Sequence, residues 1–321
     1  MYEFEKYVCS KEKLKKTIEK YGVAIITNVL NENECNEMIN NIWDFFEHIT
    51  QKWEIPIDRN NQNTWKEFYK LYPLHSMLIQ HWNVGQSQAS WNVRQNIKIV
   101  EIFSHFWNCH IDDLLVSFDG LSFNLPPEIT KRGWNLNNTW YHTDQSYSTP
   151  EFACIQSFVT GFDINDNDAT LSFMEKSNKY HEEFKNNFNV IEKSNWYKLN
   201  KEQQLFYEEK GCKIMNIKCP KGSLVFWDSR TIHCGIEANK NRIVPNFRAV
   251  IYLCYMPKNI CSEKNLKKKQ KAFNEMRTTS HYPCNIKLFP KHPRTYGNEL
   301  PTITEIEKPI LSDLGKQLAG F

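Results

Sequence analysis

Apolar and polar positions recur with two different periods along this chain, and the periods divide it into regions. Residues 11–20 are predicted to be a charged helix, and 31–49 carries an asparagine cap followed by apolar side chains three to four positions apart, which predicts a second helix. The β-branched run VAIITNV at 23–29 between them predicts a buried strand. Residues 50–76 have no clear period and are expected to be loop with a short helix, whereas 90–108 returns to helical spacing.

From 114 to 255 the pattern changes to short strand-like runs separated by turn residues. The runs are LLVSFDGLSFNL, TWYHTD, FACIQSFVTGFDI, ATLSFME, CKIMNIKC, GSLVFWDS and FRAVIYLCYM. Several short strands with few helices between them predict an antiparallel sandwich or barrel. A charged insertion at 176–210 is expected to be helical.

The three regions predict one α+β, mainly β domain over residues 1–321. Its β core spans about 114–255, behind a helical N-terminal part at 1–113. The extension at 256–321 is expected to begin with a helix and then to continue as a Pro-rich, irregular segment.

Composition and charge exclude several classes of function. The 321 residues carry a net charge of only +3, which gives no strong nucleic-acid signal, and the basic run NLKKKQK at 265–271 is interpreted as a solvated helix face. None of the ten cysteines forms a CxxC pair. The polar N-terminus and the absence of a long apolar run predict a soluble, intracellular, cytoplasmic protein with reduced thiols and no membrane partner.

The stretch WYHTDQSY at 140–147 places His142 and Asp144 two positions apart. Side chains alternate across a strand, so a strand here would point both residues to one face and turn Thr143 away. Two imidazoles and one carboxylate are the ligands of a redox-active iron site whose opposite face stays open for co-substrate and oxygen. Such a site requires a second histidine elsewhere in the chain.

Among the ten histidines, His233 is the best placed, because it follows the apolar strand predicted within KGSLVFWDS. Arg248 opens the next predicted strand, where its planar fork can pair with both oxygens of a dicarboxylic co-substrate. Arg242, in the polar loop before that strand, is the competing candidate for the same role.

Several segments in this order resemble the phytanoyl-CoA dioxygenase type of iron(II)- and 2-oxoglutarate-dependent dioxygenases. They are YGVAIITNVLNENECNEMI, LSFNLPPE followed by WYHTDQS, DATLSFMEKSNKYH, KGSLVFWDSRTIHCG and FRAVIYLCYMP, and the resemblance covers about residues 20–255. It implies a double-stranded β-helix, that is, a cupin-like jelly roll with flanking N- and C-terminal helices. It also implies a hydroxylase that uses oxygen and converts 2-oxoglutarate to succinate and carbon dioxide.

Carried over residue by residue, the resemblance implies that His142, Asp144 and His233 bind iron(II) and form the catalytic centre. Arg248 would bind the distal carboxylate of 2-oxoglutarate. Because Asp144 is present, the family pattern favours hydroxylation over halogenation. Cys234 stands directly after the distal histidine, where relatives often have a glycine followed by a serine that helps to bind the co-substrate.

Polar residues near the predicted ligands are further candidates for contacts with 2-oxoglutarate or substrate. Gln145 follows the ligand pair, and Asn124 and Gln156 lie on strands expected to be neighbours. For substrate, the candidates are Tyr147 and Arg230, although a salt bridge is an alternative for the arginine.

For two further groups of residues, a structural role is favoured over a role in the active site. Arg277 begins a polar cluster, 277–281, that could cap the mouth of a barrel and bind substrate, although packing is the favoured interpretation. Trp140 and Trp227 are expected in the core rather than in a pocket.

The substrate, a small molecule or a side chain, is not identified by the sequence. The competing functions are a cupin-type metal protein of another class, such as an isomerase or epimerase, and a non-catalytic binding module. The order of HxD, histidine and arginine argues against the first, and the intact ligand set argues against the second.

Overall fold

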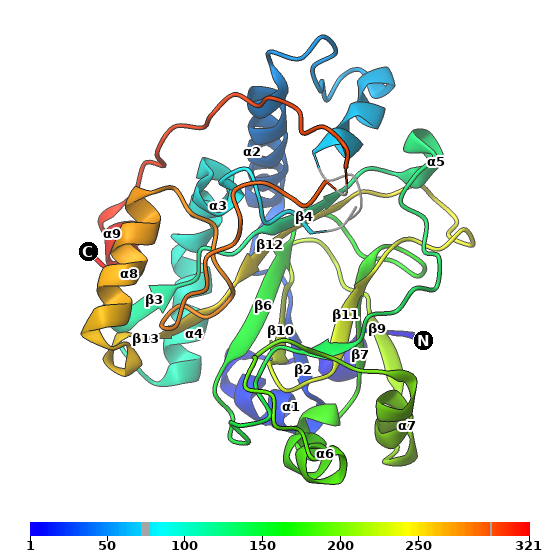
Figure 1. Cartoon of the computed structure of the whole chain (residues 1–321), viewed down its shortest axis with the longest axis vertical. Helices are drawn as coiled ribbons and strands as arrows, with labels where there is room; N and C mark the ends of the chain where they lie inside the picture. Colours follow the sequence, from blue (N-terminus) through cyan, green and yellow to red (C-terminus); the bar gives the residue numbers. More distant parts are fainter. Residues whose placement is uncertain (72–77, 296) are drawn as a thin grey trace.

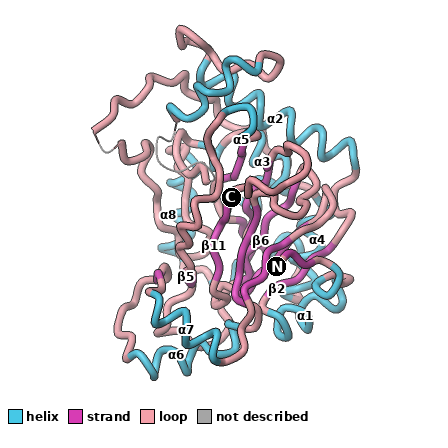
Figure 2. Tube along the Cα trace, turned by 90° about the vertical axis from the view of Figure 1, so that its right-hand side faces the viewer, coloured by secondary structure: helices cyan, strands magenta, loops and turns pink. Residues whose placement is uncertain are grey.

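The structure of the chain is a computed structural model that describes residues 1–71, 78–295 and 297–321. The strands gather in the middle of the molecule and the helices lie around them (Figure 1 and Figure 2). A six-stranded sheet has the order β1 (Tyr2–Glu3), β9 (Ile214–Ile217), β7 (Thr170–Met174), β11 (His233–Ile236), β5 (His142–Thr143) and β8 (Tyr197–Lys198). A five-stranded sheet has the order β2 (Val23–Ile26), β10 (Leu224–Asp228), β6 (Ile155–Thr160), β12 (Arg248–Leu253) and β4 (Leu121–Asn124).

A short third sheet pairs β13 (Tyr255–Pro257) with β3 (Leu114–Val116). The strands run antiparallel to their partners except β1 and β9, which are parallel. The α-helices of the described residues are α1 (Leu14–Tyr21), α2 (Glu32–Thr50), α3 (Gln88–Arg94), α4 (Ile97–Trp107), α5 (Pro127–Thr130), α6 (His181–Phe188), α7 (Lys201–Glu209), α8 (Glu263–Asn274) and α9 (Asp313–Ala319).

The five-stranded sheet is buried on both faces, and strand β10 shows why its sequence is apolar throughout. Leu224 and Phe226 point to the core shared with α2 and α4, where Phe226 lies 5.4 Å from the ring of Phe103. Val225 and Trp227 point to the opposite side and pack with residues of the six-stranded sheet. Successive side chains of a strand alternate between faces, so both faces must be apolar when both are covered. The two sheets therefore lie face to face.

Helices α6 and α7 cover the other face of the six-stranded sheet. Phe184 of α6 and Tyr207 of α7 stack with ring centroids 5.2 Å apart, in a cluster with Met174 of β7 and Cys234 of β11. This confirms the helical insertion expected at 176–210.

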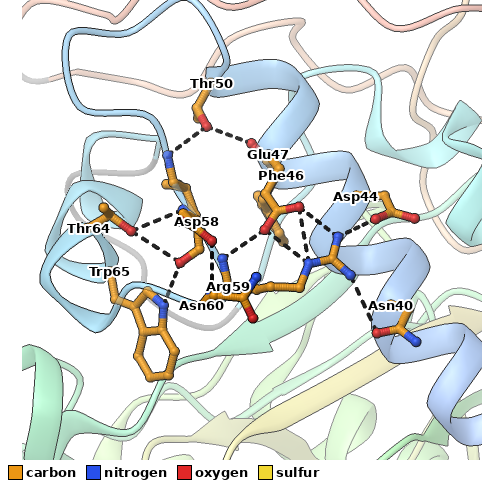
Figure 3. Close-up of polar contacts among 11 residues, drawn as sticks. Asn40, Asp44, Phe46, Glu47, Thr50, Asp58, Arg59, Asn60, Thr64 and Trp65 are labelled. Carbon is orange, nitrogen blue, oxygen red and sulfur yellow. Dashed lines mark hydrogen bonds and ion pairs between the residues drawn. The ribbon is translucent and has the colours of Figure 1, made fainter.

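Helix α2 confirms the helix predicted at 31–49, and its side chains hold the irregular segment that follows it. Asn31 forms a capping box with Glu34 at the start of the helix. Beyond its end, Arg59 folds back onto one face of α2 (Figure 3). Its Nε donates to both carboxylate oxygens of Glu47 at 3.0 and 3.1 Å, and its guanidinium also pairs with Asp44. The loop predicted at 50–76 includes a 3₁₀ helix at Gln62–Lys70, and positions 72–76 of it lie outside the described residues.

Two strand predictions differ from the structure in detail. The apolar strand predicted after the glycine turn is confirmed as β10, which ends at Asp228, but His233, expected just past that strand, itself begins β11 in the other sheet. The strand expected in TWYHTD is only two residues long.

The C-terminal extension also differs from expectation. Helix α8 is confirmed, but the segment predicted as irregular to its end contains α9, which packs against α8. The basic run 265–271 is not wholly a solvated face, because Lys269 is 0% exposed. Its ammonium donates to the carbonyl of Val116 and lies 3.8 Å above the ring of Phe118.

The architecture is a mixed arrangement of helices and several sheets rather than a mainly β one. The described strands form no closed barrel. In the same part of the chain, no helix has both the length and the apolar character needed to cross a membrane.

Candidate metal centre and active-site cavity

Three predicted ligands, His142, Asp144 and His233, meet where β5 and β11 pair. The strand register sets the two histidines directly opposite each other, and their ring centroids are 4.4 Å apart. The Asp144 Oδ2 atom lies 3.6 Å from His142 Nε2 and 3.4 Å from His233 Nε2. One ligand atom from each residue lies within 4.8 Å of the other two, a spacing that a single metal ion can bridge.

The second ring nitrogen of each histidine is fixed by the backbone. His142 Nδ1 lies 3.1 Å from the carbonyl of Trp140, and His233 Nδ1 lies 2.8 Å from the carbonyl of Thr231. A carbonyl can only accept, so both Nδ1 atoms carry the proton and donate. The lone pairs are therefore on the Nε2 atoms that face Asp144, which is the tautomer that a metal ligand needs.

The charges of this group also suit a metal ion. Burial alone would raise the pKa of the Asp144 carboxyl, but the neighbouring His142, His281 and His233 outweigh it and hold that pKa well below its usual range. Burial and the adjacent His142 lower the pKa of His233, which keeps its imidazole neutral. Two neutral imidazoles and one carboxylate are the donor set of the non-haem iron(II) oxygenases, so the residues present fit iron(II).

Gln156 of β6 supports the carboxylate from the other sheet. Its Nε2 donates to Asp144 Oδ2 at 3.1 Å and to Ser229 Oγ at 3.3 Å. The backbone N–H of Asp144 donates to the Ser229 carbonyl at 3.0 Å. Asp144 is thus oriented from two directions, as ligands at metal centres usually are.

A cavity of about 660 Å³ opens in front of the three residues. Residues from strands of both sheets line it, together with several aromatic rings and several polar side chains. Its described lining consists of Leu78, Gln80, Asp119, Trp140, His142, Asp144, Gln156, Leu171, Ser194, Asn195, Trp196, Trp227, His233, Gly235, Arg248, Tyr252, Ser280, His281, Tyr282, Asn285, Ile286, Lys287 and Phe289. A volume of this size suits a co-substrate together with a small organic substrate.

Arg248 lies in this cavity, whereas Arg242 does not. The Arg248 guanidinium donates to Ser122 Oγ at 3.2 Å and to the Ala169 carbonyl at 3.1 Å, and no carboxylate of the described residues pairs with it. Arg242 is already paired with Glu128 and Asp168. The geometry therefore leaves Arg248 available for an anionic ligand.

Of the other predicted contacts to 2-oxoglutarate, only Gln156 lines the cavity. Asn124 is the cross-strand partner of Arg248, and its side-chain oxygen accepts from Ser122. The Gln145 amide is occupied by its own loop: its Nε2 donates to the carbonyls of Thr149 and Glu151. The structure thus places these two residues outside the cavity lining.

None of the three predicted substrate residues lies in the described cavity lining. Tyr147 is in the core, where its hydroxyl lies 3.1 Å from that of Tyr207. Arg230 forms an ion pair with Asp228, which is the alternative that the sequence left open. Arg277 donates to the carbonyl of Phe289 and so holds the backbone of the tail.

The structure adds functional candidates that the sequence did not single out. Trp140 stacks on His142 with ring centroids 4.7 Å apart, and Trp227 lies 5.4 Å from the His233 ring. Trp227 is a core residue as predicted and Trp140 packs against a core cluster, but both also line the cavity, so the expectation that they lie outside a pocket was wrong. Trp140 stands two positions before His142, and the period of two that joins the histidine to Asp144 could have revealed it. Ser280 and His281 belong to the polar cluster 277–281, for which the sequence favours packing over a place at the mouth of the barrel, and both line the cavity.

The comparisons with known proteins agree with this class of site. Residues 18–242 match the family model described as phytanoyl-CoA dioxygenase (PhyH). The "Ava biosynthesis cluster protein O" of Aspergillus versicolor is 25% identical over 82% of this chain and 83% of its own length. Two solved structures share the fold at 14% identity and a TM-score of 0.57. They are GlcNAc inducible gene 2 of Candida albicans (82% of this chain, 67% of that chain) and protein JW0805 of Escherichia coli (98% and 85%).

The fold and the site define a mixed α/β protein with a His–Asp–His cluster of the non-haem iron type. The family match covers more than half of the chain. The chain belongs to the phytanoyl-CoA dioxygenase family, as its sequence motifs predicted.

Proposed function

We propose that the chain is an iron(II)- and 2-oxoglutarate-dependent dioxygenase that hydroxylates a small molecule. The observation that carries the proposal is that the three metal-ligand residues and Arg248 line the same cavity. Arg248 pairs with no carboxylate of the described residues. Bound iron(II) would supply the redox chemistry of the reaction. In that reaction oxygen is consumed, 2-oxoglutarate is converted to succinate and carbon dioxide, and the substrate is hydroxylated.

The roles of the protein residues follow from their positions. His142, Asp144 and His233 would hold the metal on one side and leave its other side open to the cavity. Arg248 would bind the distal carboxylate of 2-oxoglutarate through its planar fork. Gln156 keeps Asp144 in its orientation through the 3.1 Å hydrogen bond.

The aromatic residues around the metal position would keep water away from it. Trp140 and Trp227 each lie beside one of the two histidines, and both line the cavity. A dry surrounding strengthens the electrostatic contacts of the metal ligands and limits side reactions.

We further propose that the two facing sheets are an open double-stranded β-helix and that residues 1–321 form one domain. The supporting observation is that β2 of the N-terminal part completes the sheet of β10, β6, β12 and β4. Because strands from separate regions share one core, no natural boundary divides them.

A small molecule is preferred over a protein side chain as substrate. The name of the Aspergillus versicolor relative places that protein in a biosynthesis cluster. The cavity also has a bounded volume of about 660 Å³. The intact His–Asp–His set and Arg248 argue against a non-catalytic or non-oxygenase cupin-type protein.

Anaerobic titration of the purified chain with iron(II) and 2-oxoglutarate tests the proposal. We expect a weak charge-transfer band in the visible spectrum and slow succinate formation once oxygen is admitted. His142→Ala and Asp144→Ala should abolish both, because each removes a ligand. His110→Ala, at an exposed histidine, is the matched control and should change neither. A loaded protein without the band, or turnover that survives both substitutions, would contradict the proposal.

A further inference from the structure

One wall of the active-site cavity comes from the C-terminal extension, beyond the residues that match the family model. The family match ends at residue 242, whereas seven of the cavity-lining residues lie between 280 and 289. Hydrogen bonds attach the start of this wall to the connection between β3 and β4 and to the 3₁₀ turn before α3. Thr279 N donates to the Phe118 carbonyl at 2.8 Å, and Thr278 Oγ1 accepts from the N–H of Gly85 at 3.0 Å. The segment is therefore a built part of the site (orange in Figure 1).

His281 is one of the titratable side chains that this wall contributes to the cavity. Its ring packs on Tyr282 with centroids 4.5 Å apart. The negative charges of Asp144 and Asp119 act to raise the pKa of His281, against the larger effect of burial. Its Nε2 atom is buried and has no hydrogen-bond partner in the described part of the chain. A buried polar atom without a partner is costly, which indicates that a ligand supplies the missing hydrogen bond.

One carboxylate oxygen of the neighbouring Asp119 already accepts two hydrogen bonds. Asp119 Oδ1 accepts from the N–H of Gly120 at 2.7 Å and from Gln80 Nε2 at 3.4 Å. Burial lowers the pKa of His281, which keeps the imidazole neutral and able to donate or accept one hydrogen bond. Among the described residues of the cavity lining, His281 Nε2 and Trp227 Nε1 are the buried side-chain atoms without a hydrogen-bond partner, and of the two only the imidazole nitrogen can also accept.

The cavity that His281 lines also has an apolar and aromatic surface. Leu78, Trp196, Tyr282, Ile286 and Phe289 contribute to it alongside polar side chains of the lining, and these five residues come from three separate regions of the chain. Flat ring faces favour a ligand with a ring or a compact hydrocarbon skeleton. One hydrogen-bonding atom within such a surface would fix the orientation of that ligand.

From these contacts we propose that His281 is a specificity-determining residue, and that it hydrogen-bonds the hydroxyl or carbonyl oxygen of a neutral, ring-containing substrate. The proposal rests on the proposed function, because it places this substrate opposite the His142, Asp144 and His233 metal position. The C-terminal wall thus selects the substrate, and residues of strands β5 and β11 in the six-stranded sheet, with Asp144 directly after β5, hold the metal.

A matched pair of fluorescent probes tests this assignment: 2-naphthol and 2-methylnaphthalene have the same shape and differ in one hydroxyl group. Their affinities for the full-length chain are measured by fluorescence anisotropy, with and without iron(II) and 2-oxoglutarate under anaerobic conditions. We expect 2-naphthol to bind about 10-fold more tightly, since one net hydrogen bond has about this effect. A purely apolar pocket would instead favour the methyl compound.

Three variants separate a hydrogen bond from simple packing. His281→Phe should remove the preference for 2-naphthol while it keeps the affinity for 2-methylnaphthalene. His281→Gln should restore part of the preference, because its amide can donate and accept. The control Lys291→Ala, at an exposed position of the same tail that is not part of the described cavity lining, should leave the ratio unchanged. Equal ratios in the wild type and His281→Phe, or no binding of either probe, would overturn the proposal.

The two proposals fail in different ways. If the iron and 2-oxoglutarate band forms but the probe ratio does not depend on His281, the dioxygenase proposal stands and the specificity proposal fails. If the band is absent, the dioxygenase proposal fails, and the probe ratio of the metal-free protein still reports on His281.

Discussion

At the scale of single residues, the proposed metal centre depends on hydrogen bonds that are made by atoms other than the ligand atoms. The Nδ1 atoms of His142 and His233 donate to the carbonyls of Trp140 and Thr231, so that each Nε2 is left with its lone pair. Asp144 is supported differently, because Gln156 donates directly to its Oδ2 atom, the oxygen that faces both histidines. These contacts prepare the site before a metal binds.

Arg248 provides a prediction at this scale. Arg248→Lys keeps the charge but loses the planar fork, so the KM for 2-oxoglutarate should rise by about 10-fold or more. Steady-state succinate formation measures this, and the wild-type maximal rate should be approached at high co-substrate concentration.

Arg242→Lys is the matched control for that experiment. Arg242 is paired with Glu128 and Asp168 away from the cavity, so the same exchange there should leave the KM unchanged. If Arg242→Lys raised the KM and Arg248→Lys did not, the assignment of the co-substrate arginine would have to be reversed.

Lys269 is a buried cation that no catalytic role explains, and it predicts a pH dependence of stability. Burial lowers its pKa in the folded protein to about 7, whereas the unfolded chain should titrate near 10.4. Between these values the unfolded state binds more protons, so the free energy of unfolding should rise with pH across this window. Below about pH 7 the destabilisation from the buried ammonium is fully present.

Lys269→Met removes this titration. Between pH 7 and 9 the wild type should gain about 2 kcal/mol in unfolding free energy relative to the variant. Denaturant unfolding at both pH values measures the difference, and other titrating groups cancel because both proteins contain them. Parallel pH profiles would show that Lys269 does not have the lowered pKa.

At the scale of elements, the turn before β10 fixes how the sheet meets the entry to α2. The carbonyl of Gly222 accepts from the N–H groups of Val29 and Leu30 at 2.9 and 3.1 Å. Gly222 has φ +75°, and a Cβ added there would lie 2.1 Å from the Leu30 carbonyl oxygen. This close approach of two backbones requires glycine.

Gly222→Ala should therefore lower the free energy of unfolding by more than about 3 kcal/mol, from the left-handed backbone together with the steric clash. Gly211→Ala is the matched control: its φ is +78°, but nothing lies within 4 Å of the added Cβ. The control should cost only about 1 kcal/mol in a denaturant titration. If both variants lost the same unfolding free energy, the backbone around Leu30 would have moved to accept the added Cβ without an energetic cost.

At the scale of the whole molecule, the metal position joins strands that are distant in sequence, so occupancy should stabilise the complete fold. At about 100 times the dissociation constant, a ligand that binds only the folded state adds about 2.7 kcal/mol. Anaerobic thermal unfolding should show a higher Tm with iron(II) and 2-oxoglutarate, and a chelator should reverse the increase. Asp144→Ala should lose the shift. A shift retained in that variant would locate the metal elsewhere.

The sequence by itself determined the local elements and the identity of the candidate ligands. The capping box and apolar spacing of α2 act within a few turns of one helix. The HxD pair, His233 and Arg248 could be singled out by spacing, strand position and family resemblance. The structure then brought all four into one cavity.

Only the tertiary structure decided which polar residues face that cavity. Gln145 stands beside a ligand but binds its own loop, whereas His281 reaches the cavity from a tail without regular pattern. Sequence spacing governs neighbours within an element, and the pairing of β11 with β5 or the return of the C-terminal wall depends on contacts between distant segments. For this reason the sequence could indicate the metal ligands, and the fold was needed to show what surrounds them.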